Sequence, residues 1–89
     1  MRDFVLTKGV MIMIINAAIL KDGIIYTGRR HHLIIQSHPS KFFIDCKQGF
    51  ITEEGRFVDR EEGLRIAIEC NQLIREPKFE LFSEDLWEL

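Results

Sequence analysis

Residues 14–27, IINAAILKDGIIYT, decide the fold of this 89-residue chain. Two aliphatic runs lie on either side of Asp22-Gly23. An Asp-Gly pair between β-prone runs is a strong short-range signal for a tight hairpin turn. The stretch therefore predicts a β-hairpin, with one strand from about residue 14 to 20 and its partner from about 24 to 27.

A basic stretch follows this hairpin. The second strand ends near Gly28, and RRHHLIIQSH (residues 29–38) then places apolar residues among basic ones. Pro39 cannot continue a helix because it lacks a backbone N–H group and restricts the residue before it. We therefore predict a short helix from about Arg30 to Ser37, followed by a short strand or a packed loop containing FFIDC (residues 42–46).

A second hairpin is predicted over residues 49–58, GFITEEGRFV, in which two apolar runs flank a turn containing Gly55. Asp59 follows at once, and Glu62 stands three positions later, as in an Asp-x-x-Glu capping box. These signals predict the main helix, from Arg60 to about Gln72, with Arg60 facing water. Its apolar stripe is predicted to comprise Gly63, Leu64, Ile66, Ala67, Ile68 and Cys70.

Together these elements predict a small single α+β domain, in which two β-hairpins form an antiparallel sheet beside one main helix and one short helix. Methionines at 11 and 13 suggest a later natural start. Residues 1–12 are therefore predicted to be a disordered or non-native extension, and residues 13–89 to be the domain. Trp87, in the apolar C-terminal segment, is predicted to pack against the domain or a partner chain.

Size and charge restrict the classes of partner. A domain of this length buries a core that is only just sufficient, so we expect a homo-oligomer. Residues 1–44 carry a net charge of +4 and residues 45–89 a net charge of −6, which disfavours a duplex nucleic acid partner. The apolar run over residues 10–20 is too short to span a membrane. Two cysteines without a CxxC pair favour a reducing compartment, the cytoplasm.

The predicted strand-to-helix junction is the candidate binding site. Free N–H groups and the helix dipole favour an anion there, and Arg can hold a phosphate through two hydrogen bonds. Tyr26 or Phe57 is expected to stack on a base, and Arg60 joins the site if the two hairpins share one sheet. A solvated basic surface or structural ion pairing would explain the same residues. The junction residues are Arg29, Arg30, His31 and His32, with Arg30 expected to be exposed.

The sequence predicts neither a metal site nor a reactive cysteine. Neighbouring helix residues point about 100° apart, so His31 and His32 are poorly placed to share one metal ion, and no HxxxH or HExxH motif occurs. Cys70 belongs to the apolar stripe, and Asp45 beside Cys46 would raise the pKa of that thiol rather than lower it. We therefore expect no metal, no cofactor and no catalytic residue, so the protein is not predicted to be an enzyme.

Three sequence blocks carry a resemblance: RHH (residues 30–32), QGFITEEGRFVDREEGLRIA (48–67) and LFSEDLW (81–87). The pattern resembles a family of small proteins encoded in bacteriophage and prophage genomes. It is also similar to the Thoeris anti-defence sponge proteins, which are small oligomers that sequester cyclic nucleotide or ADP-ribose-type immune signals without cleaving them. This resemblance implies a phage-type protein that captures an anionic cyclic nucleotide in the host bacterial cytoplasm.

An alternative hypothesis is a protein–protein inhibitor or adaptor, similar to an anti-CRISPR factor, whose acidic second half mimics nucleic-acid phosphates. The surface distinguishes the two hypotheses. A cleft lined by Arg30, His31 and an aromatic residue would favour nucleotide capture, whereas a continuous acidic face without a basic pocket would favour the mimic.

Overall fold

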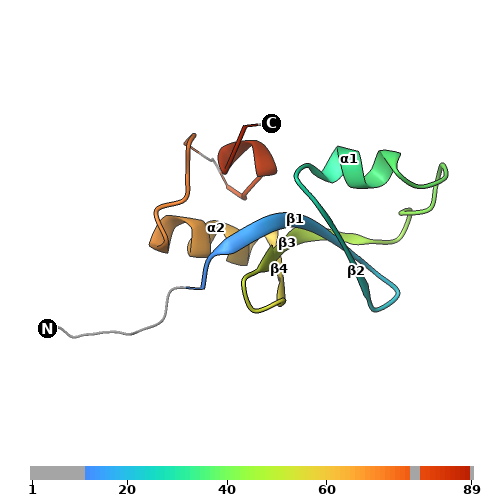
Figure 1. Cartoon of the computed structure of the whole chain (residues 1–89), viewed down its shortest axis with the longest axis horizontal. Coiled ribbons are helices and arrows are strands. Elements are labelled where there is room, and N and C mark those ends of the chain that lie inside the picture. Colours follow the sequence, from blue (N-terminus) through green and yellow to red (C-terminus); the bar gives the residue numbers. More distant parts are fainter. Residues whose placement is uncertain (1–11, 77–78, 89) are drawn as a thin grey trace, which may run out of the picture.

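The computed structural model describes residues 12–76 and 79–88 of the chain (Figure 1). Its elements are strands β1 (Ile14–Lys21), β2 (Ile24–Gly28), β3 (Lys47–Thr52) and β4 (Phe57–Asp59), helices α1 (His31–Gln36) and α2 (Arg60–Glu69), and a 3-10 turn η1 (Ser83–Asp85). The predicted α+β class, with two hairpins, one longer helix and one short helix, is confirmed. The predicted extension lies outside the described residues except for Ile12.

The two hairpins form one antiparallel sheet with the strand order β2-β1-β3-β4. The first hairpin turns through Asp22 and Gly23, whose φ angles of 52° and 78° suit this residue pair. The second turns through Gly55, at a φ of 82°. Residues 40–45 form turns rather than a strand, so FFIDC belongs to a packed loop. Because both hairpins belong to one sheet, the end of β2 and the start of α2, which follows β4, lie in the same domain.

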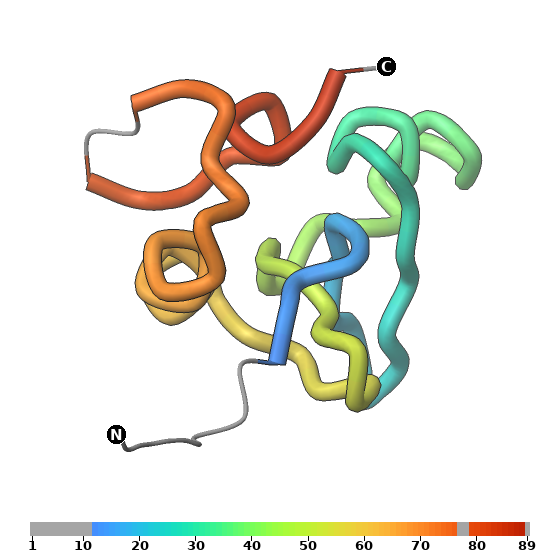
Figure 2. The backbone as a smooth tube through the Cα atoms, turned by 60° about the vertical axis from the view of Figure 1, so that its left-hand side comes forward, coloured from blue at the N-terminus to red at the C-terminus, as the bar shows by residue number. Residues whose placement is uncertain are grey.

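The core lies on one face of this sheet. Because side chains alternate along a strand, Ala17 and Ile19 of β1 share that face with Phe50 of β3 and Val58 of β4. All four are buried, and so is Ile14 of β1. The helices α1 and α2, the loop between α1 and β3, and the C-terminal segment supply the rest of the cluster: Ile34, Phe43, Ala67, Leu81 and Leu86. Figure 2 shows the C-terminal segment in red, beside the orange and yellow chain of α2.

Helix α2 begins as the sequence predicts, although its capping box is incomplete. The Asp59 side chain accepts a hydrogen bond of 2.8 Å from the backbone N–H of Glu62. The Glu62 carboxylate instead pairs with the Arg56 guanidinium at 2.9 Å. The helix ends at Glu69 rather than near Gln72, and Asn71 there adopts a positive φ of 56°.

Two details of the predicted surface of α2 are wrong. Ile68, assigned to the apolar stripe, is 59% exposed, because its position on the helix turns away from the sheet. Arg60, expected to face water, has only 15% of its side chain exposed, since the C-terminal segment crosses it.

The C-terminal segment packs as part of the domain. Leu81 is fully buried. Trp87 packs against the core, as predicted, and its indole N–H donates a hydrogen bond of 2.8 Å to the backbone carbonyl of Arg29. Among the described residues, no helix is long and apolar enough to cross a membrane.

Candidate functional site

A groove of about 240 Å³ lies between α1 and the segment that contains η1, where β3 begins. It brings together residues from four separate parts of the chain. Three of the predicted binding residues, His31, His32 and Arg60, are among those that line it. The full lining is His31, His32, Ile35, Gln48, Arg60, Phe82, Ser83 and Glu84.

Arg60 is the most firmly held cation of this groove. As the first residue of α2, it donates from its guanidinium to the carbonyl oxygen of Leu81 at 2.8 Å and to the side-chain oxygen of Gln48 at 2.6 Å. The guanidinium carbon lies 4.6 Å from the centre of the Phe82 ring, in a cation–π contact. Burial lowers the pKa of Arg60, although a guanidinium stays protonated in proteins. The groove therefore contains a fixed positive charge.

The two adjacent histidines have different roles. His31 is buried, and its Nε2–H donates to the carbonyl oxygen of Gly49 at 2.7 Å, since a carbonyl can only accept. Its ring also meets the Phe50 ring edge-on, with the centroids 5.2 Å apart. Burial, with a smaller effect from Arg60, lowers the pKa of His31, so this imidazole is neutral at neutral pH. His32 lies on the exposed side of α1, at the rim of the groove.

Arg30 is not placed as predicted. It is only 7% exposed, and its guanidinium donates to the carbonyl oxygens of Ser83 at 2.9 Å and Trp87 at 2.7 Å. Its backbone is extended at the start of α1, but its side chain fastens the C-terminal segment. The expectation of an exposed arginine is therefore wrong, because the carbonyl groups of a distant segment bind it.

Arg29 also lies outside the groove. Its guanidinium donates to the carbonyl oxygen of Ile15 at 3.1 Å and to the side-chain oxygen of Asn16 at 3.3 Å. The guanidinium carbon lies 4.5 Å from the centre of the Trp87 ring. Arg29 and Arg30 thus hold the C-terminal segment from two sides, and the row of four basic residues does not form one site.

The two predicted aromatic residues lie elsewhere as well. Tyr26 packs edge-on against His38, Phe42 and Phe43, with centroids 5.1–5.7 Å apart. Phe57 pairs with Ile51 on the sheet face opposite the core. The aromatic residue in the groove is Phe82, which is 47% exposed.

Phe82, Gln48 and Glu84 line the groove but are not among the residues predicted from the sequence. Phe82 and Glu84 belong to the C-terminal segment, which is predicted only as an apolar segment that packs through Trp87. A signal was nevertheless present in LFSEDLW, where polar residues interrupt the apolar ones and so indicate one buried side and one exposed side.

Glu84 adds a negative charge to the groove. A hydrogen bond from its own backbone N–H lowers the pKa of the Glu84 carboxyl, as do the Ser83 hydroxyl, at 3.3 Å, and the nearby charge of Arg30. The carboxylate is therefore ionised and can only accept hydrogen bonds. Positive and negative groups thus line the same groove, which suits a ligand that has both phosphate oxygens and N–H or O–H donors.

This chain matches a protein-family model over residues 13–87. The model is described as phage T4 y16D protein. The chain belongs to this family. No curated protein and no solved structure matches it significantly. The match to the y16D family covers every residue that lines the groove, and it confirms the expected membership of a family of small phage proteins.

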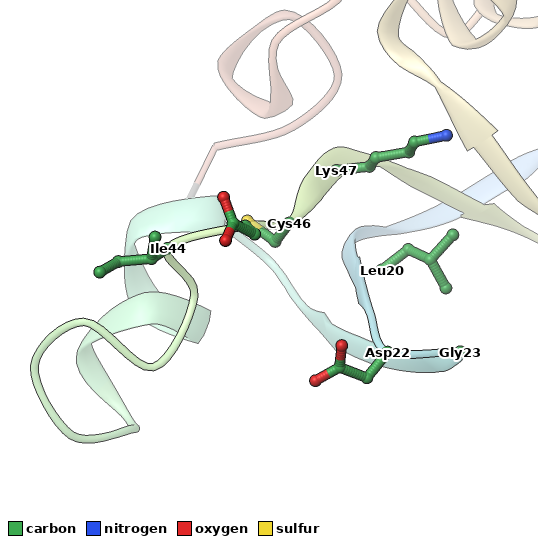
Figure 3. A pocket seen from close by; sticks show the side chains of 7 residues that line it. Leu20, Asp22, Gly23, Ile44, Cys46 and Lys47 are labelled. Carbon is green, nitrogen blue, oxygen red and sulfur yellow. The ribbon is translucent and has the colours of Figure 1, made fainter.

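This y16D family member has a second, more open hollow of about 470 Å³ at the turn of the first hairpin (Figure 3). None of the predicted binding residues lines it. Its residues are Leu20, Asp22, Gly23, Ile44, Asp45, Cys46 and Lys47. Within residues 12–76 and 79–88, no three His, Cys, Asp or Glu side chains come together in a way that could hold a metal ion.

Proposed function

We propose that this phage protein binds an anionic cyclic nucleotide in the groove between α1 and the C-terminal segment, and holds it without cleaving it. One observation carries the proposal. His32, Arg60 and Phe82 reach the same groove from α1, from α2 and from the C-terminal segment. A histidine, a guanidinium and an exposed aromatic ring are the groups that hold a phosphate and stack on a base.

The phosphate is assigned to the side of the groove formed by His32 and Arg60. Because Leu81 and Gln48 fix the guanidinium of Arg60, its orientation is set before a ligand arrives. Such preorganisation lowers the cost of binding. His31 is neutral and hydrogen-bonded to Gly49, so it keeps its position on the buried side of the groove.

The base is assigned to the exposed ring of Phe82 and to Ile35, which is 39% exposed. Glu84 then accepts hydrogen bonds from ribose hydroxyls or from base N–H groups, which offsets the cost of placing a carboxylate near a phosphate. At about 240 Å³, the groove is smaller than typical ligand pockets of about 300–1,000 Å³. We therefore assign to each groove no more than one nucleotide unit of a ligand.

The hydrogen bonds and pKa values of the groove residues fit a protein that binds a nucleotide without reacting with it. A general base must have a free nitrogen or oxygen within reach of the proton that it removes. The Nε2–H of His31 donates to Gly49 and leaves only Nδ1 to accept a proton, and burial lowers the pKa of this imidazole. The lowered pKa of the Glu84 carboxyl likewise makes its carboxylate a weak base. The host bacterial cytoplasm is the proposed place of action, since the immune signals that such a protein would capture are made there.

The test is to incubate the purified protein with a panel of cyclic nucleotides and ADP-ribose isomers, remove unbound ligand, release the captured ligand by heat, and identify it by mass spectrometry. Recovery of an unchanged nucleotide is expected. A converted product would instead indicate an enzyme. If no member of the panel is captured, the proposal is wrong, and the protein–protein inhibitor hypothesis becomes the better one.

Two variants locate the site. His32→Ala and Arg60→Lys should each weaken capture by roughly tenfold or more, because a hydrogen bond to a charged group contributes about 1.5–3 kcal/mol. Gln36→Ala on α1 and Arg65→Lys on α2 are the matched controls, since both residues are exposed and neither lines the groove. Equal losses in variants and controls would indicate general charge attraction rather than a site.

A further inference from the structure

The sheet has a second face that carries apolar side chains. Ile19 and Phe50 point into the core, so their neighbours in the same strands point the opposite way. We call this surface the open face. Its apolar residues are Ala18, Leu20, Ile25, Ile51 and Phe57. Apart from Ala18, they are partly exposed, and none of the five belongs to the core cluster or packs against it.

This composition is unusual for a solvated surface. An antiparallel sheet with one face in water normally alternates apolar and polar residues along each strand. Here both faces of β1 are apolar between Ala17 and Leu20. At the centre of the open face Ala18 pairs with Gly49, and both residues are buried. The Phe57 ring lies over Gly49, so that a Cβ atom there would be 2.8 Å from the ring.

We propose that the open face is the contact surface of a homodimer, in which two copies of the sheet pack face to face. The open face has two bulky ends, one formed by Leu20 and Ile25 and the other by Ile51 and Phe57. A second copy, turned over on this face, can set each bulky end on the partner's opposite end. Such a surface is complementary to itself, as a two-fold contact requires.

The charges at the border of the open face also fit a second copy. Lys47 pairs with Leu20 in the sheet and its side chain extends on the same side (Figure 3). Asp59 pairs with Gly49 in the neighbouring row. Both residues are exposed. A two-fold axis in the plane of the sheet can bring Lys47 opposite the partner's Asp59, and symmetry then repeats this ion pair.

The area of the open face limits the affinity of the dimer. Strands of eight, five, six and three residues, at about 3.3 Å per residue and about 4.8 Å apart, give on the order of 350 Å² per copy. A standard stable interface buries about 800 Å² per partner. We therefore expect a weak dimer that forms at micromolar concentrations and dissociates on dilution. The groove lies on the core side of the sheet, so both grooves stay accessible, and this proposal is independent of nucleotide capture.

The experiment is sedimentation equilibrium over a series of protein concentrations from low to high micromolar. The wild-type protein should pass from monomer to dimer. Ile51→Thr should weaken the dimer at least tenfold, because two copies of the side chain leave the interface and threonine still suits a strand. Ile68→Thr, the same change at an exposed position on α2, should leave dimerisation unchanged.

A purely monomeric wild-type protein, or a dimer that Ile51→Thr leaves intact, would overturn the proposal. Circular dichroism checks that each variant is folded. If Ile51→Thr does not fold, Lys47→Glu tests the same surface through charge, because it would place a carboxylate opposite the partner's Asp59. It should weaken the dimer several-fold, and an unchanged dimer would equally overturn the proposal.

Discussion

The guanidinium of Arg30 donates a hydrogen bond of 2.7 Å to the backbone carbonyl oxygen of Trp87. A second bond, of 2.9 Å, reaches the carbonyl of Ser83, so one buried side chain holds both ends of the segment from residue 83 to 87. This segment also forms one wall of the groove through Ser83 and Glu84. The position of the wall therefore depends on an arginine that does not itself line the groove.

Arg30→Ala should destabilise the domain by roughly 3 kcal/mol or more, since two charge-assisted bonds of about 1.5–3 kcal/mol are lost and two carbonyl groups lose their partner. The fluorescence of Trp87, the only tryptophan, should shift to longer wavelength as its ring becomes exposed. Urea unfolding and emission spectra measure both effects. Arg65→Ala is the control, because Arg65 is exposed. Unchanged stability in Arg30→Ala would contradict this assignment.

The stability of the domain should fall in mild acid because of His31. Folding lowers the pKa of this residue below its ordinary value of 6.5, chiefly through burial. Below about pH 6.5 the unfolded chain therefore binds more protons than the folded one, and stability decreases as the pH falls. Above that pH this contribution is fully present.

His31→Gln removes the titrating group but keeps an N–H donor for the carbonyl of Gly49. Urea unfolding at several values between about pH 5 and pH 7 should show a steeper loss of stability in the wild-type protein than in the variant. Parallel curves would mean that His31 does not cause the loss.

Asp59→Ala should cost about 1 kcal/mol of stability, because the first turn of α2 loses the acceptor for the backbone N–H of Glu62. Asp59→Asn retains an accepting oxygen and should stay within about 0.5 kcal/mol of the wild type. Nucleotide capture should persist in both, since Asp59 does not line the groove. Capture lost at full stability would make Asp59 a binding residue. The measurements are thermal melts in dilute protein and the capture assay.

Gly49→Ala should disturb the pairing of β3 with β4. A Cβ atom at this position would collide with the carbonyl oxygen of Val58 and press on the Phe57 ring. We expect a loss of at least about 2 kcal/mol in urea unfolding, as for other overpacked sites. Thr27→Ala, at an exposed position of β2, should change stability by less than about 0.5 kcal/mol. Similar values for the two variants would show that the strands adjust without cost.

Local signals predicted most of the fold. The Asp22-Gly23 and Gly55 turns and the Asp59 cap each depend on a few neighbouring residues, and all three are present in the structure. Membership of a small phage protein family could also be predicted, from blocks that lie within the matched residues 13–87.

The site was predicted less well, because its contacts join distant residues. Arg30 is 53 residues away from Ser83 in the sequence, and Arg60 is 21 residues away from Leu81. Helix periodicity identifies the exposed side of an isolated helix, but not the segment that later covers it. For that reason two arginines expected to be exposed proved to be partly or fully buried, and Phe82 took the place of Tyr26 and Phe57 beside the groove.

The burial of Leu81 and Leu86 in the core has a consequence for synthesis on the ribosome. The four strands and α2 emerge first, but the core they form lacks two of its leucines. Arg30 meanwhile has a guanidinium whose carbonyl partners have not yet been made. We therefore expect the nascent chain to remain an incomplete domain, open to chaperones and proteases, until residue 87 has left the exit tunnel.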